Sequence, residues 1–147
     1  MNVITIPKRQ APKRRVNKGM YPNEYLYSRE HEWVRVEDDV CVLGITEYAQ
    51  QELGEVVFVE LPEIGQVFDA NDELGTIESV KAVAEVYTPV AGEIVEVNDA
   101  VVDDPELLNE DPHAEGWLVK IRFSSAADLK SLLNAEQYEE FVQSGEA

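Results

Sequence analysis

The sequence is poor in several residue types, and each shortage excludes a class of structure or site. Cys41 is the only cysteine, so no disulfide can form within the chain, which suits a reducing compartment. His31 and His113 are the only histidines, and one cysteine with two distant histidines does not match zinc-ligand spacing. No apolar run approaches the roughly 18 residues of a membrane helix, and the N-terminus lacks the apolar stretch of a secretory signal. We therefore expect no membrane partner.

Basic residues are scarce beyond the first 20 positions. The net charge is −18, and residues 1–20 contribute +6, so residues 21–147 carry −24. A body this acidic should repel nucleic acid and anionic membranes and should favour partners with basic surfaces. An acidic surface can also serve only to keep a protein in solution, and net charge does not distinguish this interpretation from binding to basic partners.

Residues 1–20 are predicted to be a disordered basic tail, which contains Pro7 and Pro12 and no sustained apolar period. An organelle transit peptide is the alternative interpretation, because such peptides are rich in arginine and poor in acidic residues. The tail lacks serine, which argues against it. We expect a bacterial cytoplasmic protein, or a mitochondrial matrix protein if the tail is a transit peptide. Residues 21–147 are predicted to form one domain.

The apolar fraction of 44% is enough for a packed core, and short apolar segments broken by turns indicate a mostly β fold. Side chains alternate between the two faces of a strand, so the last predicted strand, residues 117–123, should direct one set toward the core: Trp117, Val119, Ile121 and Phe123. The predicted strands cover residues 31–36, 40–45, 56–61, 66–68, 74–79, 83–88, 93–97 and 117–123.

Short helices are expected at the periphery, and a helical segment is expected at the C-terminus. Their predicted N-caps are Thr46, Asp104, Ser125 and Asn134, and Gln137 completes a capping box with the last of these. Gly54 should end the first helix. Residues 54–59 resemble residues 92–97, which indicates either an internal duplication or ordinary strand sequence.

The segment from residue 74 to 89 has the most distinctive pattern. Strand-forming residues flank Val80 and Lys81, so Lys81 should lie at a hairpin tip, although no Asn-Gly turn signal is present. The other lysines of the domain, Lys120 and Lys130, are predicted on a strand and a helix. A lysine that projects from a rigid tip can be acylated by an enzyme. Position alone favours an ordinary solvated lysine.

Residues 78–82 (ESVKA) resemble the lipoylation motif of glycine cleavage H proteins. The resemblance extends over roughly residues 25–142 in the family's order and spacing. It implies a lipoyl/biotinyl-type flattened barrel, or hybrid-motif sandwich. Its further matching segments include residues 31–34, 44–46, 53–62, 92–94 and 116–118.

By this resemblance, lipoic acid is joined covalently to the side-chain nitrogen of Lys81. The rest of the recognition hairpin is Glu78, Ser79, Val80 and Ala82. Glu32 matches a family glutamate near the pocket that shelters the arm. The sequence departs from some family members at Glu52 and Glu85, so the shelter should differ in detail.

The resemblance implies a carrier that is not itself an enzyme. Its lipoyl arm would shuttle the aminomethyl group of glycine from glycine decarboxylase (P protein) to an aminomethyltransferase (T protein). Dihydrolipoyl dehydrogenase (L protein) would reoxidise the arm, and a lipoyl transferase or ligase would attach it. We expect the carrier to be a monomer.

Three rival hypotheses remain. A biotinyl or lipoyl domain of a larger enzyme shares the hairpin lysine, but Val80 and Ala82 replace the methionines usual in biotin carriers. An H-like protein that donates lipoyl groups to 2-oxoacid dehydrogenases would have almost the same sequence. A self-contained enzyme is disfavoured, because no catalytic constellation is recognisable.

Overall fold

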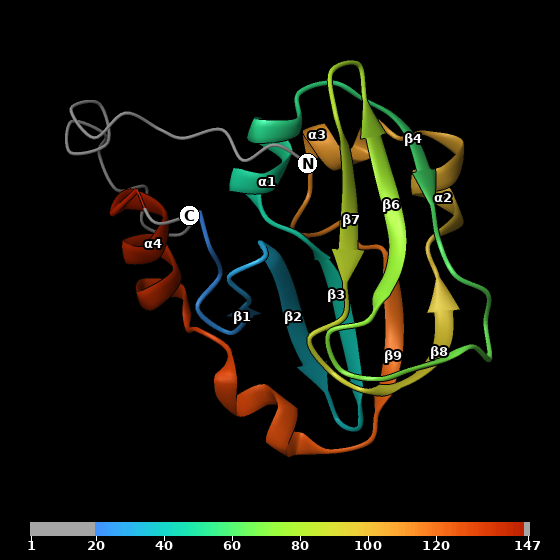
Figure 1. Ribbon diagram of the computed structural model, residues 1–147, viewed down its shortest axis with the longest axis vertical. Coiled ribbons are helices and arrows are strands. Elements are labelled where there is room, and N and C mark those ends of the chain that lie inside the picture. The colour runs from blue at the N-terminus through green and yellow to red at the C-terminus, as the bar shows by residue number, and fades with distance from the viewer. Residues whose placement is uncertain (1–19, 146–147) are drawn as a thin grey trace.

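The computed structural model describes residues 20–145, and it folds them into two antiparallel sheets with helices at the periphery (Figure 1). The strands are β1 (Leu26–Tyr27), β2 (Glu32–Glu37), β3 (Val40–Ile45), β4 (Val56–Glu60), β5 (Val67–Phe68), β6 (Glu73–Ser79), β7 (Val83–Tyr87), β8 (Gly92–Val97) and β9 (Val119–Phe123). One sheet has the order β1-β2-β3-β9-β8-β5, and the other has the order β4-β6-β7. The predicted mostly β fold is confirmed. The predicted tail at residues 1–20 lies, except for Met20, outside the described residues.

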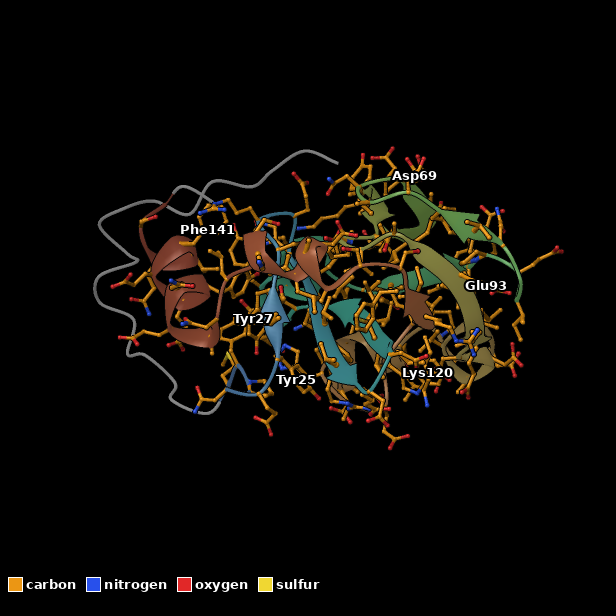
Figure 2. The ribbon with its side chains drawn as sticks, turned by 90° about the horizontal axis from the view of Figure 1, so that it is seen from below. Tyr25, Tyr27, Asp69, Glu93, Lys120 and Phe141 are labelled. Atoms are coloured by element: carbon orange, nitrogen blue, oxygen red, sulfur yellow. The ribbon has the colours of Figure 1, made fainter. Side chains whose placement is uncertain are left out.

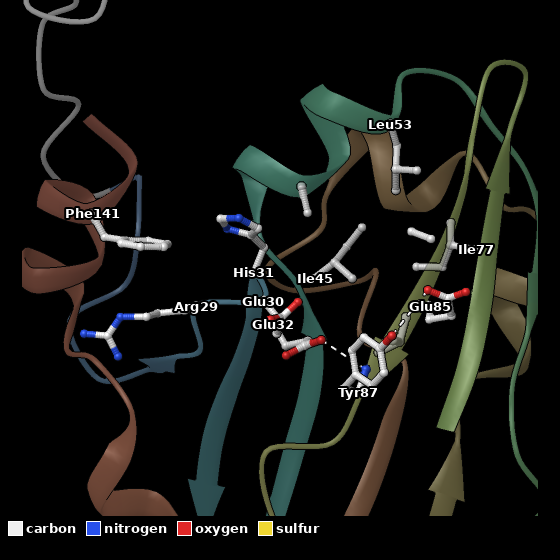
Figure 3. A pocket seen from close by; sticks show the side chains of 13 residues that line it. Arg29, Glu30, His31, Glu32, Ile45, Leu53, Ile77, Glu85, Tyr87 and Phe141 are labelled. Atoms are coloured by element: carbon white, nitrogen blue, oxygen red, sulfur yellow. Dashed lines mark hydrogen bonds between the residues drawn. The ribbon is translucent and has the colours of Figure 1, made fainter. Parts of the chain in front are cut away.

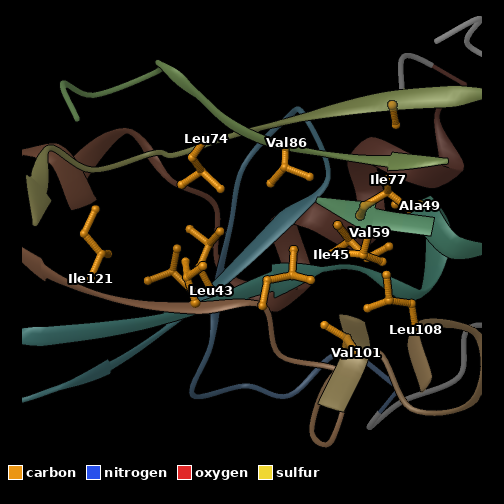
Figure 4. Close-up of a cluster of buried hydrophobic side chains, with 14 of the residues drawn as sticks. Leu43, Ile45, Ala49, Val59, Leu74, Ile77, Val86, Val101, Leu108 and Ile121 are labelled. Atoms are coloured by element: carbon orange, nitrogen blue, oxygen red, sulfur yellow. The ribbon is translucent and has the colours of Figure 1, made fainter. Parts of the chain in front are cut away.

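The hydrophobic core lies between the two sheets (Figure 4). Leu43 of β3 and Ile121 of β9 supply side chains from the larger sheet, and Ile77 of β6 supplies one from the smaller sheet. All three are at most 1% exposed. Truncating one such side chain to alanine typically costs about 2–5 kcal/mol, so this interior holds the hairpin of the smaller sheet in place.

The last strand is shorter than its sequence pattern predicts. Trp117 does not face the core between the sheets, which the pattern predicted; it is partly buried and packs against a second, aromatic cluster, while Leu118 is fully buried in the core between the sheets. Trp117 instead ends a turn, in which its N–H donates to the carbonyl oxygen of Ala114 at 3.2 Å. The Lys120 ammonium lies 5.3 Å from the Trp117 ring centroid. The regular alternation of buried and exposed residues therefore starts only at Val119, where β9 begins.

Local capping signals account for the first and last helices. Helix α1 (Glu47–Leu53) begins at Thr46, whose hydroxyl accepts the N–H of Ala49, and ends at Gly54. Helix α4 (Ala135–Gln143) begins at Asn134, and the predicted capping box is present. Ser125 also acts as an N-cap, but the segment that follows it is the 3-10 helix η2 (Ala126–Ser131).

The prediction that Asp104 caps a helix is wrong. Asp104 ends α2 (Asp99–Asp103), which Asn98 caps by accepting the N–H of Ala100. The following residues form a turn, in which Leu107 N–H donates to the Asp104 carbonyl oxygen. Helix α3 (Leu107–Glu110) then begins without a side-chain cap. The Asn98 amide also donates to two carbonyl oxygens far along the chain, so a tertiary contact selects the earlier helix.

A second, aromatic cluster joins the N-terminal strands to α4. Tyr27 stacks on Tyr138 with 4.9 Å between ring centroids, and Tyr25 stacks on Trp33 at 4.7 Å. Figure 2 shows Tyr27 of β1 lying near α4, which carries Phe141. Met20 packs against this cluster. The contacts fix α4 beside the start of β2, where the pocket described below is found.

Helices of the described segment are all too short or too polar to span a lipid bilayer.

Candidate functional site

Lys81 lies at the tip of the hairpin formed by β6 and β7 (Figure 1). The last cross-strand pair is Glu78 with Val83. Beyond it, Ser79 N–H donates to the carbonyl oxygen of Ala82 at 2.8 Å and closes the turn. The side chain of Lys81 is exposed. The sequence pattern therefore placed this lysine correctly in the fold, and its chemical role stays a prediction.

The side chain of Ser79 holds the turn in shape. Its Oγ accepts the backbone N–H groups of Lys81 at 3.2 Å and of Ala82 at 3.0 Å. The hydroxyl is directed at the Ala82 carbonyl oxygen at 3.3 Å. Val80 and Lys81 are not among the described residues with positive φ, so the turn does not require Asn-Gly. The buried side chain of Ser79 thus stabilises a turn whose sequence has no Asn-Gly signal.

The tip is also tied to the segment between α1 and β4. Val80 N–H donates to the carbonyl oxygen of Glu55 at 3.0 Å. The Lys81 side chain lies over Gly54, where a Cβ would be 3.5 Å from Lys81 Cε. Glu52 interacts electrostatically with Lys81, which opposes the rise that burial causes in the pKa of Glu52. The Lys81 stem therefore runs along the end of α1.

A pocket of about 400 Å³ opens between α1, β7 and the start of β2 (Figure 3). Its apolar walls come from both sheets and from α1, and Leu53, the neighbour of Gly54, is one of them. Its rim carries Arg29, Glu30 and Glu85, and Phe141 of α4 stands at one side. The other apolar lining residues are Ile45, Ala49, Ile77, Ala84 and Val86.

Glu32 is the buried polar group of this pocket, with 2% of its surface exposed. Ser28 Oγ donates to one carboxylate oxygen at 2.5 Å, and Tyr87 N–H donates to the other at 3.0 Å. Burial raises the pKa of Glu32 to about 7, against the lowering effect of these two hydrogen bonds. The group is therefore poised to gain or lose a proton near neutral pH.

The structure brings Glu78, Ser79, Val80 and Ala82 around Lys81, and it places Glu32 at the pocket rather than at the tip. Sequence reasoning missed the apolar walls, since residues such as Ala49 and Ile77 follow the same pattern as core residues. No group of three metal-ligating side chains gathers anywhere in the described segment.

A family model described as "Glycine cleavage H-protein" matches residues 25–145. The chain belongs to the glycine cleavage H-protein family. Similar proteins named "Glycine cleavage system H protein" occur in Herpetosiphon aurantiacus, Staphylococcus epidermidis and Carboxydothermus hydrogenoformans, at 55%, 51% and 46% identity. These alignments cover 82%, 82% and 85% of this chain, and 92%, 96% and 96% of the relatives.

The H-protein fold is also found among solved structures. A crystal structure of a glycine cleavage system H protein from Mycobacterium marinum superposes with a TM-score of 0.75 at 37% identity. The superposition covers 80% of this chain and 94% of that one. The two-sheet arrangement around the hairpin is therefore that of an H protein.

Proposed function

We propose that this chain is the lipoyl carrier of a glycine cleavage system, with lipoic acid in amide linkage to Lys81. The observation that carries the proposal is an exposed lysine at a fixed hairpin tip in a chain of the H-protein family. The proposed role is that of a carrier subunit that is not itself an enzyme.

The residues at the tip fit a long covalent arm. Lys81 is exposed, and Ser79 and the Glu55 carbonyl oxygen hold the backbone on either side of Val80. Bound there, the lipoyl group supplies a disulfide that can take up electrons and a one-carbon amine unit. Lys81 orients the arm, and the fixed turn keeps its point of attachment constant for each partner.

The pocket beside α1 is the proposed shelter for the arm. Its walls are apolar and would exclude water, while Glu32 can hold a proton or accept one at its carboxylate oxygens. Glu30 and Glu85 outnumber Arg29 at the rim, and the resulting net negative charge favours a cationic amine over a neutral group. Because Leu53 lines the pocket and the next residue, Gly54, borders Lys81, the tip and the shelter lie close together in space.

The proposed partners are glycine decarboxylase, the aminomethyltransferase, dihydrolipoyl dehydrogenase and the lipoyl-attaching enzyme. The strongly acidic domain should attract basic surfaces on them, and these contacts should weaken as salt rises. The bacterial sources of the relatives support the cytoplasm over the mitochondrial matrix as the compartment.

Mass spectrometry of the intact chain after incubation with lipoate, ATP and a lipoate–protein ligase tests the attachment. We expect one lipoyl increment, on the peptide that contains Lys81. Lys81→Arg should fold normally and gain no increment, whereas Lys130→Arg, at the exposed Lys130 of η2, should be modified like the wild type. Modification of the Lys81→Arg chain would overturn the assignment.

Glycine cleavage is separated from the lipoyl-relay alternative by a second assay. The loaded chain should support glycine-dependent CO2 release with the other three components of the system. Transfer of its lipoyl group to a 2-oxoacid dehydrogenase subunit, without any glycine-dependent release, would favour the relay instead. The names of the relatives support glycine cleavage.

A further inference from the structure

Exposed apolar side chains gather around the hairpin tip. Eight large apolar side chains of the described residues are exposed, and four of them belong to the turn that carries Lys81 or to strands β4 and β7. These four, which we call the tip patch, are Val57, Phe58, Val80 and Val83, at 47%, 51%, 68% and 49% exposure. Single exposed apolar residues are common, but a cluster on a soluble protein marks a contact surface.

A β-bulge in β4 creates half of this patch. Val56 pairs with Ser79 and Phe58 pairs with Glu78, so Val57 is an extra residue on the β4 side. In an unbroken strand one of two consecutive residues would turn inward, yet Val57 and Phe58 are both exposed. β4 is an edge strand, and bulges do protect edges from pairing. Charged side chains are another common protection of edges, and here the bulge presents apolar ones instead.

The patch draws on the two edge strands of the smaller sheet, β4 and β7, and on the turn between β6 and β7. Phe58, Glu78 and Val83 are consecutive cross-strand partners, and this row lies immediately before the turn that carries Lys81. Lys81 is the only basic side chain between Arg35 and His113 in the sequence. The exposed carboxylate of Glu78 therefore lies between Phe58 and Val83, exposed Glu55 precedes β4, and Lys81 is the one basic side chain that these elements contribute.

We propose that the tip patch docks the enzyme that attaches the lipoyl group to Lys81, and that this partner offers an apolar hollow bordered by lysine or arginine. The inference rests on the proposed carrier function. The attaching enzyme forms its bond at Nζ of Lys81, so its active site must close around the tip. Enzymes that act on the sulfur atoms work at the far end of the arm and need not contact Phe58. An exposed aromatic residue beside a fixed turn is the kind of anchor that dominates such interfaces.

Steady-state lipoyl attachment tests the proposal, with lipoate, ATP, a lipoate–protein ligase and the unmodified full chain as the varied substrate. In Phe58→Thr we expect the KM for the chain to rise at least tenfold while kcat stays within twofold, because docking is lost and the chemistry at Nζ is not. Val67→Thr removes a side chain that is 71% exposed on the other sheet, and it should leave both constants within twofold. Val83→Thr on β7 should repeat the rise in KM, which keeps the test valid if Phe58→Thr fails to fold.

Each remaining outcome decides one of the two proposals. If Phe58→Thr and Val83→Thr are both lipoylated with the KM and kcat of the wild type, the docking surface is overturned and the carrier function is left intact. A wild-type chain that takes up no lipoyl group would overturn the carrier function itself. Phe58→Thr that has been lipoylated to completion should be turned over by dihydrolipoyl dehydrogenase at the wild-type rate. An equal loss in that reaction would overturn the assignment of the patch to the attaching enzyme.

Discussion

The backbone N–H of Tyr87 donates a hydrogen bond to Oε2 of Glu32, and this 3.0 Å bond joins the two sheets at the mouth of the pocket (Figure 3). Tyr87 ends β7, the strand that leads back from Lys81, while Glu32 begins β2. The carboxyl group therefore couples the hairpin to the larger sheet. Because the group is buried, that coupling depends on its protonation state.

Replacing Glu32 by glutamine should remove a pH dependence of stability. Burial raises the pKa of Glu32 from 4.5 in the unfolded chain to about 7 in the folded protein. Such a group stabilises the fold fully below pH 4.5 and progressively less as the pH rises to 7. Between pH 5 and pH 8 the wild type should lose about 2–3 kcal/mol of unfolding free energy relative to Glu32→Gln. Urea titrations at the two pH values measure this difference.

The matched control for this prediction is Glu63→Gln, which removes one negative charge at an exposed position. It should leave the pH dependence of stability as in the wild type. Other titrating groups, including the buried His31, are present in every variant, so they cancel when variants are compared. Parallel stability curves for the wild type and Glu32→Gln would show that the carboxyl group is not buried in solution as it is here.

Removing the Tyr138 hydroxyl should destabilise the attachment of α4. The hydroxyl lies 2.7 Å from Nδ1 of His31 and 2.7 Å from Oγ1 of Thr46, and Tyr138 is fully buried. Tyr138→Phe would leave both groups without this partner, at a cost of about 1–3 kcal/mol in unfolding free energy. Tyr87→Phe removes a hydroxyl that binds the exposed Glu85 at 3.3 Å, and it should cost much less. Equal losses in the two variants would contradict the prediction.

The elements that local sequence signals specify were predictable. The alternation on either side of Lys81 predicted the β6–β7 hairpin, because an antiparallel pair joined by a short turn needs no distant partner. The capping box of Asn134 with Gln137 also acts within one helical turn. In both cases the residues that decide the structure are close together in sequence.

The elements that were missed depend on distant contacts. Asn98 begins α2 with its side chain also bound to the carbonyl oxygens of Glu115 and Trp117, which no local pattern reveals. The pocket combines α1, both sheets and Phe141 of α4. Its walls have the same hydrophobic period as the core, so only the three-dimensional arrangement distinguishes a wall from an interior position.

Truncating Ser79 should loosen the turn that carries Lys81. Ser79→Ala removes the acceptor of the Lys81 and Ala82 N–H groups, so hydrogen exchange at both amides should become faster. A loss of about 1 kcal/mol of turn stability corresponds to a lipoyl attachment rate about fivefold lower. Ser79→Thr keeps the oxygen and should restore the rate, whereas Ser131→Ala, in the exposed turn of η2, should change neither readout. An unchanged attachment rate in Ser79→Ala would mean that the enzyme does not require a preformed turn.

At Gly54, a backbone conformation that favours glycine lies next to the side chain of Lys81. Its φ of 77° and ψ of −151° lie in a region that only glycine adopts readily, so Gly54→Ala should cost about 1–3 kcal/mol in unfolding free energy. The added Cβ would contact Lys81 Cε at 3.5 Å, an ordinary van der Waals distance, so strain rather than a clash should cause this loss.

Gly65→Ala provides the control, because Gly65 has a φ of 95° and nothing within 4 Å of its Cβ position. Urea titrations should show comparable destabilisation in the two variants, but only Gly54→Ala should alter the rate of lipoyl attachment, since only there does the backbone support the lysine stem. Equal attachment rates in the two variants would show that the stem does not depend on the end of α1.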